Sequence, residues 1–202
     1  MRPSNCPGLG YLQLDVKYVT PELSGLPYTC YLYAAIPTRR DSRYKVGLIL
    51  PKLDEGGALL ALYHATAVFG ISDQQFPFPL QYVQSDDAEA ATDNGLEFQQ
   101  RFHAKCATAV CGISDLQLEH FYIHKSSPND NAVIERSFRT DEEEFFFWLK
   151  EAPQDHCRCN RHHRLELNTW YQAYLVTYNT IRPHMGINML TPKEAIDLYQ
   201  KS

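Results

Sequence analysis

Three acidic residues are spaced along the sequence so that they could share one metal site. Asp15 lies in "YLQLDVKYVT", Asp93 lies in "TDNGLEF", and Glu135 lies in "NAVIER". Carboxylates brought together could hold two divalent cations about 3.5–4 Å apart, which activate a water or a 3′-hydroxyl and stabilise the leaving oxygen of a phosphodiester. Hard cations prefer oxygen ligands. The acidic residues are therefore candidate ligands for two Mg²⁺ or Mn²⁺ ions.

The second acidic position has two candidates in the stretch "QYVQSDDAEAATDNGLEF". Asp86 directly ends a strand-like segment, which is where a metal ligand is expected. Asp93 is followed by Asn94 and Gly95, which can turn the backbone sharply so that the strand is released into a helix. The residues alone leave the choice between Asp86 and Asp93 open.

The hydrophobic pattern predicts the elements that must position these acids. Leu12, Leu14 and Val16 alternate with polar residues, which is the period of a half-buried strand with Asp15 on its polar side. The predicted strands are 11–20, 28–37, 44–52, 80–86 and 118–125. The predicted helices are 55–70, 96–110, 166–180 and 191–200, the last with Thr191 as N-cap. A further long helix is predicted after "SSPNDN". It carries Glu135 in its first turns and ends before Pro153. Three strands followed by alternating helices and strands predict an α/β fold with a mixed sheet.

Length and composition describe an ordinary globular chain. The 202 residues are enough for one compact domain, and 44% of them are hydrophobic. No apolar run is about 18 residues or longer, so the sequence predicts no membrane partner. The six cysteines predict free thiols and a cytoplasmic setting. The formal net charge of -5 argues mildly against nucleic-acid binding, because such proteins usually carry a basic excess.

Four segments that occur in order resemble a known family. They are "LQLDVKYV", "TDNGLEF", "KSSPNDNAVIERSFRTDEEEFF" and "YNTIRPHMGINMLTPKEA". Together they resemble the catalytic core of the retroviral-integrase superfamily, most closely the transposases of bacterial insertion sequences, over roughly residues 8–200. The resemblance implies an RNase H-like fold, with a mixed five-stranded sheet flanked by helices. Residues 8–153 would form the catalytic core, and residues 154–202 would form a C-terminal helical extension.

The resemblance also implies a function. The family uses a metal-dependent Asp-Asp-Glu triad to nick DNA and transfer strands, and the matching residues are Asp15, Asp93 and Glu135. Asp93 is matched through its Asn94 and Gly95 context. The implied cofactor is Mg²⁺ or Mn²⁺, as two ions. The implied partners are transposon ends, target DNA and further copies of the chain in a homo-oligomer on DNA, with no small-molecule substrate, in the bacterial cytoplasm at the nucleoid.

Polar residues around Glu135 are candidate DNA contacts. The predicted contacts are Lys125, Ser126, Ser127, Asn131 and Arg136. The lysine and the serines precede the long helix and could hold a phosphate. Asn131 and Glu135 are four residues apart and share a helical face, so Asn131 could contact DNA or orient the Glu135 carboxylate. Arg136 could contact a phosphate or pair with an acidic neighbour. In "RPH", Arg182 and His184 could face DNA, but we interpret them as a latch, that is, as residues whose packing holds the C-terminal segment in place.

The sequence departs from the family pattern in three segments that resemble insertions. They are "DAEAATD", "ATAVCGISD" and "HCRCNRHHR". The histidines and cysteines of the last could suit zinc, but Cys-x-Cys is tighter than the usual ligand spacing, and we interpret this segment as a basic surface insertion. Because insertions could spoil the metal geometry, two rival functions stay open. One is a catalytically impaired remnant that acts only as a DNA-binding or oligomerisation module, and the other is a stand-alone nuclease.

Overall fold

The computed structural model describes residues 11–37, 42–69, 82–85, 118–122, 131–151 and 160–199. At its centre is a five-stranded sheet with the order β3-β2-β1-β4-β5. The strands are β1 (Tyr11–Val19), β2 (Cys30–Pro37), β3 (Val46–Leu50), β4 (Tyr82–Ser85) and β5 (Glu119–Tyr122). β2 pairs antiparallel with β1 and β3, whereas β4 pairs parallel with β1 and β5. The predicted mixed sheet and its five strands are confirmed.

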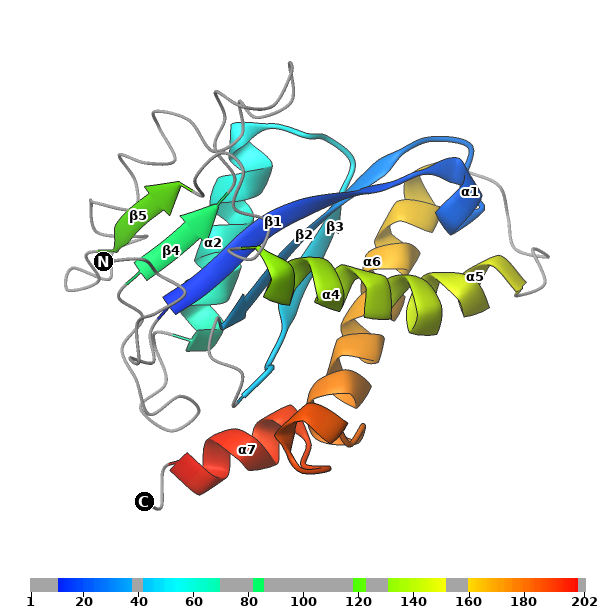
Figure 1. The fold of residues 1–202 in the computed structure, drawn as a ribbon. Helices are drawn as coiled ribbons and strands as arrows, with labels where there is room; N and C mark the ends of the chain where they lie inside the picture. Colours follow the sequence, from blue (N-terminus) through cyan, green and yellow to red (C-terminus); the bar gives the residue numbers. More distant parts are fainter. Residues whose placement is uncertain are drawn as a thin grey trace.

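Helices flank this sheet (Figure 1). They are α1 (Pro21–Ser24), α2 (Glu55–Phe69), α4 (Ala132–Asp141), the π-helical turn η4 (Glu142–Phe146), α5 (Phe147–Glu151), α6 (Asn160–Thr180), the 3-10 turn η5 (Met185–Ile187) and α7 (Pro192–Tyr199). α2 covers one face of the sheet, α4 and α5 run across the other, and α7 lies beyond the C-terminal end of α6 (Figure 1). The predicted helix over 96–110 lies outside the described residues. No helix in the described part of the chain is both long and apolar enough to cross a membrane.

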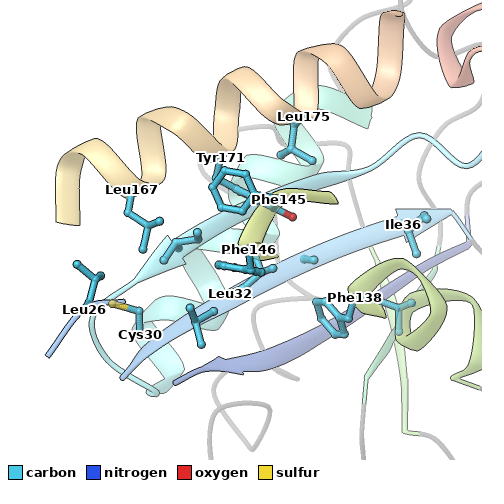
Figure 2. Close-up of a cluster of buried hydrophobic side chains, with 14 residues drawn as sticks. Leu26, Cys30, Leu32, Ile36, Phe138, Phe145, Phe146, Leu167, Tyr171 and Leu175 are labelled. Atoms are coloured by element: carbon cyan, nitrogen blue, oxygen red, sulfur yellow. The ribbon is translucent and has the colours of Figure 1, made fainter. Parts of the chain in front are cut away.

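β1 serves two hydrophobic clusters because successive side chains of a strand point to opposite faces. Leu12 and Leu14 belong to the cluster that packs against α2. Gln13 and Asp15 make their contacts on the other face, with residues of α4 and its N-cap. On that face a second cluster joins β2 with α4, η4 and α6 (Figure 2). The polar side of β1 is therefore covered by a helix, and Gln13 is only 3% exposed.

α6 covers the outer edge of the sheet, which β3 forms. Asn168 Oδ1 accepts a hydrogen bond from the Ile49 N–H at 2.9 Å, and Gln172 Nε2 donates to the Gly47 carbonyl at 2.8 Å. Further along, Asn179 bonds both backbone groups of Lys45, at 2.9 Å and 2.7 Å. These amide side chains satisfy edge groups that would otherwise be open to pairing with another strand.

Two local features differ from the prediction. α6 begins at Asn160, so residues 160–164 of the segment interpreted as a surface insertion belong to a helix. The helix extends this far because no glycine or proline interrupts residues 160–180, and arginine and leucine are good helix formers. The short helix α1 was not predicted, although Pro21 at its first position and the left-handed Gly25 at its end are typical helix boundaries.

Candidate active site

Asp15 lies where β1 emerges from its pairing with β4. The parallel register between the two strands ends with Gln13 opposite Gln84, two residues before Asp15. On the other side, Asp15 lies opposite Ala34 of β2. The carboxylate is half-buried, and its Oδ1 accepts a hydrogen bond from the Val16 N–H at 2.7 Å. It therefore stands at the carboxyl end of a parallel strand pair, which is where ligands bind in open α/β sheets.

Asn131 brings the beginning of α4 against this carboxylate. Its Nδ2 donates to Asp15 Oδ2 at 2.9 Å, and the Asn131 side chain is 6% exposed. The carboxylate that Asn131 contacts is that of Asp15, whereas the i, i+4 spacing had suggested Glu135. Within the described residues, Asn131 Oδ1 has no hydrogen-bond partner. An amide oxygen is a hard donor of the kind that binds Mg²⁺.

Gln13 takes over the capping of α4. Asn131 is the N-cap residue, but its side chain makes no capping hydrogen bond, because it is turned to Asp15. Instead, Gln13 Oε1 accepts the hydrogen bond from the Ile134 N–H at 3.1 Å. This N–H is one of those that a helix leaves without an internal partner. Two neighbouring polar residues of β1 thus fix the first turn of α4, and the positive end of the helix lies beside Asp15.

Glu135 lies in that same first turn and is exposed. Its backbone N–H bonds the Asn131 carbonyl at 3.1 Å, and Ile134 before it is fully buried. Because Asn131 and Glu135 are four residues apart, they lie on the same face of α4, and Asn131 contacts Asp15. Arg136 follows and is also exposed. The structure therefore places Asp15, Asn131 and Glu135 at one junction between β1 and α4.

The remaining predicted site residues lie outside the described residues. They are Asp93 and its alternative Asp86, and Lys125, Ser126 and Ser127. Ser85, the last residue of β4, directly precedes Asp86, and its Oγ bonds His120 Nε2 of β5 at 2.7 Å. Within the described part of the chain no three acidic, histidine or cysteine side chains gather as a metal site. Two of the three predicted acids are described, and the carboxylate and amide oxygens at this junction fit Mg²⁺ in kind.

Arg182 and His184 of "RPH" make contacts that hold the end of α6 against η4. Arg182 pairs with Glu144 of η4 and donates to His184 Nδ1 at 3.0 Å. His184 is 4% exposed, packs edge-on against the Tyr178 ring, and its Nε2 lies 3.2 Å from the Tyr178 carbonyl. Because arginine can only donate, Nδ1 is the acceptor and Nε2 carries the proton. These contacts support the predicted latch.

Sequence reasoning missed Gln13 and a buried cluster around Lys45. The signal for Gln13 was available, because it stands two residues before Asp15 and hence on the same face of the strand. Lys45 gave no such signal, since a lysine is almost always exposed unless it is paired. Only the packing of three elements around it shows that it is buried.

The five-stranded mixed sheet, its strand order and the helices on both of its faces match the fold of integrase catalytic cores, which is RNase H-like. A family described as "Integrase core domain" matches residues 116–192, a range that includes Asn131 and Glu135 but not Asp15. No curated protein matches the sequence.

Solved structures show the same fold. The chain is similar to the catalytic core domain of BIV integrase, with a TM-score of 0.61 and 14% identity over 96% of this chain and 97% of that chain. For the HTLV-2 integrase catalytic core domain in complex with magnesium, in its trimeric form, the TM-score is 0.61 and the identity 13%, over 92% and 95% of the two chains. For a simian T-cell lymphotropic virus intasome in complex with PP2A regulatory subunit B56 gamma, the TM-score is 0.59 and the identity 15%, over 86% of this chain and 49% of that chain. The predicted closeness to bacterial insertion-sequence transposases stays a prediction.

Proposed function

We propose that the chain is the catalytic core of a DNA-integrating or transposing enzyme, which nicks DNA and transfers strands with divalent metal ions. The observation that carries this proposal is the junction of β1 and α4. There the Asp15 carboxylate bonds Asn131, and the same helical turn carries Glu135. The integrase-core fold, and the match of the integrase core domain family to residues 116–192, support the proposal.

In this proposal Asp15 and Glu135 are carboxylate ligands of Mg²⁺ or Mn²⁺, and Asp93 is the third, with Asp86 as the alternative. Two bound ions would activate the attacking oxygen and stabilise the leaving oxygen of the phosphodiester. Asn131 holds the Asp15 carboxylate in one orientation through its 2.9 Å hydrogen bond. Gln13 fixes the turn from which Glu135 projects. The protein's contribution is thus to position the acids before the metal and the DNA arrive.

DNA would lie along the exposed beginning of α4. Arg136 is exposed there and is proposed to contact a phosphate, together with Lys125, Ser126 and Ser127. Such contacts fix the position of the duplex without reading its sequence. We propose that several copies act together on transposon ends and target DNA, because the similar solved structures include an intasome and a trimeric form of a catalytic core.

Metal-dependent nicking of a supercoiled plasmid tests the proposal. We expect nicking with Mn²⁺ or Mg²⁺ that falls by about 10³-fold or more in Asp15→Asn and in Glu135→Gln, because each change removes a charged ligand. Glu143→Gln is the matched control, since Glu143 is an exposed acid of the same helical segment that pairs only with the exposed Arg139 among the described residues. This control should nick like the wild type.

The same assay identifies the second acid and separates the rival functions. Asp93→Asn should abolish nicking and Asp86→Asn should not; the reverse result would make Asp86 the ligand. Nicking without joining of a labelled DNA end to the plasmid would indicate a stand-alone nuclease. If the wild type neither nicks DNA nor gains thermal stability from Mg²⁺ or Mn²⁺, the enzyme proposal is wrong and the non-catalytic module is favoured.

A further inference from the structure

A buried ion pair joins α4 to the sheet and to α6. Lys45, directly before β3, and Asp141, the last residue of α4, pair with each other, and both side chains are fully buried. The Lys45 ammonium also donates to the Ser137 carbonyl at 3.2 Å and lies 5.4 Å from the centre of the Phe138 ring. Tyr171 of α6 donates from its hydroxyl to the same Asp141 oxygen at 3.1 Å.

Stability alone does not account for two charges in this position. Burial lowers the pKa of Lys45 and raises the pKa of Asp141, and in each case the charge of the partner opposes the shift. Removing two charges from water is costly, and a well-packed apolar pair of similar volume is often as stable or more stable. An ion pair with further hydrogen bonds holds its groups in one arrangement, because these interactions depend on direction. Contacts between apolar side chains do not.

The contacts of Lys45 fix α4 along its axis and about it. Ser137 and Asp141 are four residues apart, so the ammonium binds one face of the helix at two successive turns. At the other end, β1 holds the Ile134 N–H through Gln13. Glu135 lies between Ile134 and Ser137, two positions at which described residues of the sheet side hold the helix backbone from outside. Its place relative to Asp15 therefore depends on both anchors.

α6 in turn holds Lys45. Asn179 bonds the backbone N–H and the carbonyl of Lys45, and Tyr171 bonds its ionic partner. Phe138 and Tyr171 belong to the same hydrophobic cluster around this pair (Figure 2). α6 therefore contacts both charged residues.

We propose that Lys45 and Asp141 are positioning residues, which use the support of α6 to set the height and rotation of α4 and thereby the place of Glu135 beside Asp15. Glu135 is a metal ligand only under the proposed function, on which this role rests. The ion pair contacts neither the DNA nor the metal, and acts through the helix backbone.

A double replacement separates positioning from simple stability. Lys45→Met alone leaves a buried carboxylate without its partner and should lower the Tm by roughly 6–20 °C. Lys45→Met with Asp141→Leu should recover most of that loss. In the recovered double variant, we expect the Ile134 and Glu135 amides to exchange with deuterium at least about tenfold faster than in the wild type, while amides in the middle of α2 keep their protection. Wild-type protection of Ile134 and Glu135 in this variant would overturn the proposal.

Two further variants keep the test decisive if the double variant does not fold. Tyr171→Phe removes one hydrogen bond to Asp141 and keeps the ring, so it should fold and accelerate exchange at Ile134 by about threefold. Unchanged exchange at Ile134 in Tyr171→Phe would contradict the proposal. Arg139→Gln is the matched control, because it breaks an ion pair of the same helix whose side chains are 78% and 65% exposed. It should change neither exchange nor Tm.

DNA nicking adds a kinetic readout. In the double variant kcat should fall by about 10- to 100-fold with little change in the KM for DNA, because a displaced carboxylate affects the reaction more than DNA binding. An equal rise in KM with unchanged kcat would contradict positioning of Glu135. If the wild type does not nick DNA, the proposed function fails, whereas exchange at Ile134 and Glu135 still decides whether the ion pair positions the helix.

Discussion

At the scale of single residues, the side chain of Asn131 does not serve the helix that it begins. Asparagine is among the favoured N-cap residues because its oxygen can accept a helix N–H. Here its amide donates to Asp15, and Gln13 from β1 supplies the missing acceptor. Because Asn131 bonds Asp15, it does not cap its own helix, but the two hydrogen bonds join β1 to α4 at the candidate metal site. The roles proposed for Asp15 and Asn131 thus depend on the contact between them.

Asn131→Asp tests this coupling without assuming catalysis. Two carboxylates within hydrogen-bond distance repel each other, so we expect the free energy of unfolding at neutral pH to fall by about 1–3 kcal/mol. Added Mg²⁺ should restore part of the loss, because a cation between the carboxylates relieves the repulsion. Urea unfolding with and without Mg²⁺ measures both effects.

The same substitution at Asn188 is its control, since Asn188 is exposed in the turn after η5. Asn188→Asp should leave the free energy of unfolding unchanged in either buffer. If Asn131→Asp is as stable as the wild type, the contact with Asp15 is not formed in solution. If it is destabilised and Mg²⁺ has no effect, the junction does not bind the metal.

At the scale of elements, the end of α6 is fastened by an imidazole that must stay neutral. His184 accepts from Arg182 at Nδ1 and faces the Tyr178 carbonyl with Nε2. A second proton on Nδ1 would bring its N–H against the guanidinium. Burial lowers the pKa of His184, and the positive charges of Arg182 and Arg43 lower it further. The hydrogen bond to the Tyr178 carbonyl opposes this shift.

Acid should weaken this latch. The unfolded chain binds the proton of His184 near the ordinary pKa of about 6.5, whereas the folded chain binds it only at lower pH. The stabilising contribution is therefore complete above that pH and is lost as the pH falls below it, because the unfolded state then binds more protons. Urea unfolding of the wild type at pH 7.5 and 5.5 should show the decrease.

His184→Gln should show a smaller decrease between the two pH values, because the amide can donate and accept without titrating. His64 is a second contributor of the same sign, since burial also lowers its pKa. His64→Gln therefore serves as the comparison, and the two substitutions together should remove more of the pH dependence than either one. A His184→Gln protein with the full pH dependence of the wild type would show that the latch does not depend on a neutral imidazole.

At the scale of the whole molecule, α6 closes the edge of a sheet whose strands all precede it in the chain, between residues 11 and 122. Asn179 bonds Lys45 across 134 positions of sequence, and Asn168 bonds Ile49 across 119. Leu167, Tyr171 and Leu175 of α6 lie in the same buried cluster as Leu32 and Ile36 of β2 (Figure 2). α6 therefore both closes the edge of β3 and fills the core behind the candidate active site.

Asn179→Leu should be among the more damaging single changes at this edge. It leaves the buried N–H and carbonyl of Lys45 without partners, so the free energy of unfolding should fall by roughly 2–4 kcal/mol. Thermal or urea unfolding measures the loss. Thr180→Leu is the control on the neighbouring exposed position and should change the stability by less than about 0.5 kcal/mol. Equal stability of the two variants would show that the edge contacts of Asn179 contribute little.

The sequence by itself determined the features that are encoded over a few residues. The alternation in β1 gave its two faces, and Thr191 began α7 as predicted, with its hydroxyl bonded to the Glu194 N–H at 3.2 Å and the Glu194 carboxylate bonded to the Thr191 N–H at 2.8 Å. The α/β class and the mixed sheet followed from the order of the predicted elements, and the integrase-type fold followed from the resemblance of four motifs to that family. The choice between Asp86 and Asp93 stays a prediction.

Tertiary structure alone decided which distant side chains meet. Gln13 became the cap of α4, Asn131 turned to Asp15, and Lys45 became buried against Asp141. None of these follows from local pattern, because strand and helix periods specify which way a residue faces but not which residue of another element it finds. That pairing is set by how α4 and α6 pack on the sheet, and burial then makes each polar contact obligatory, since an unpaired buried group is costly.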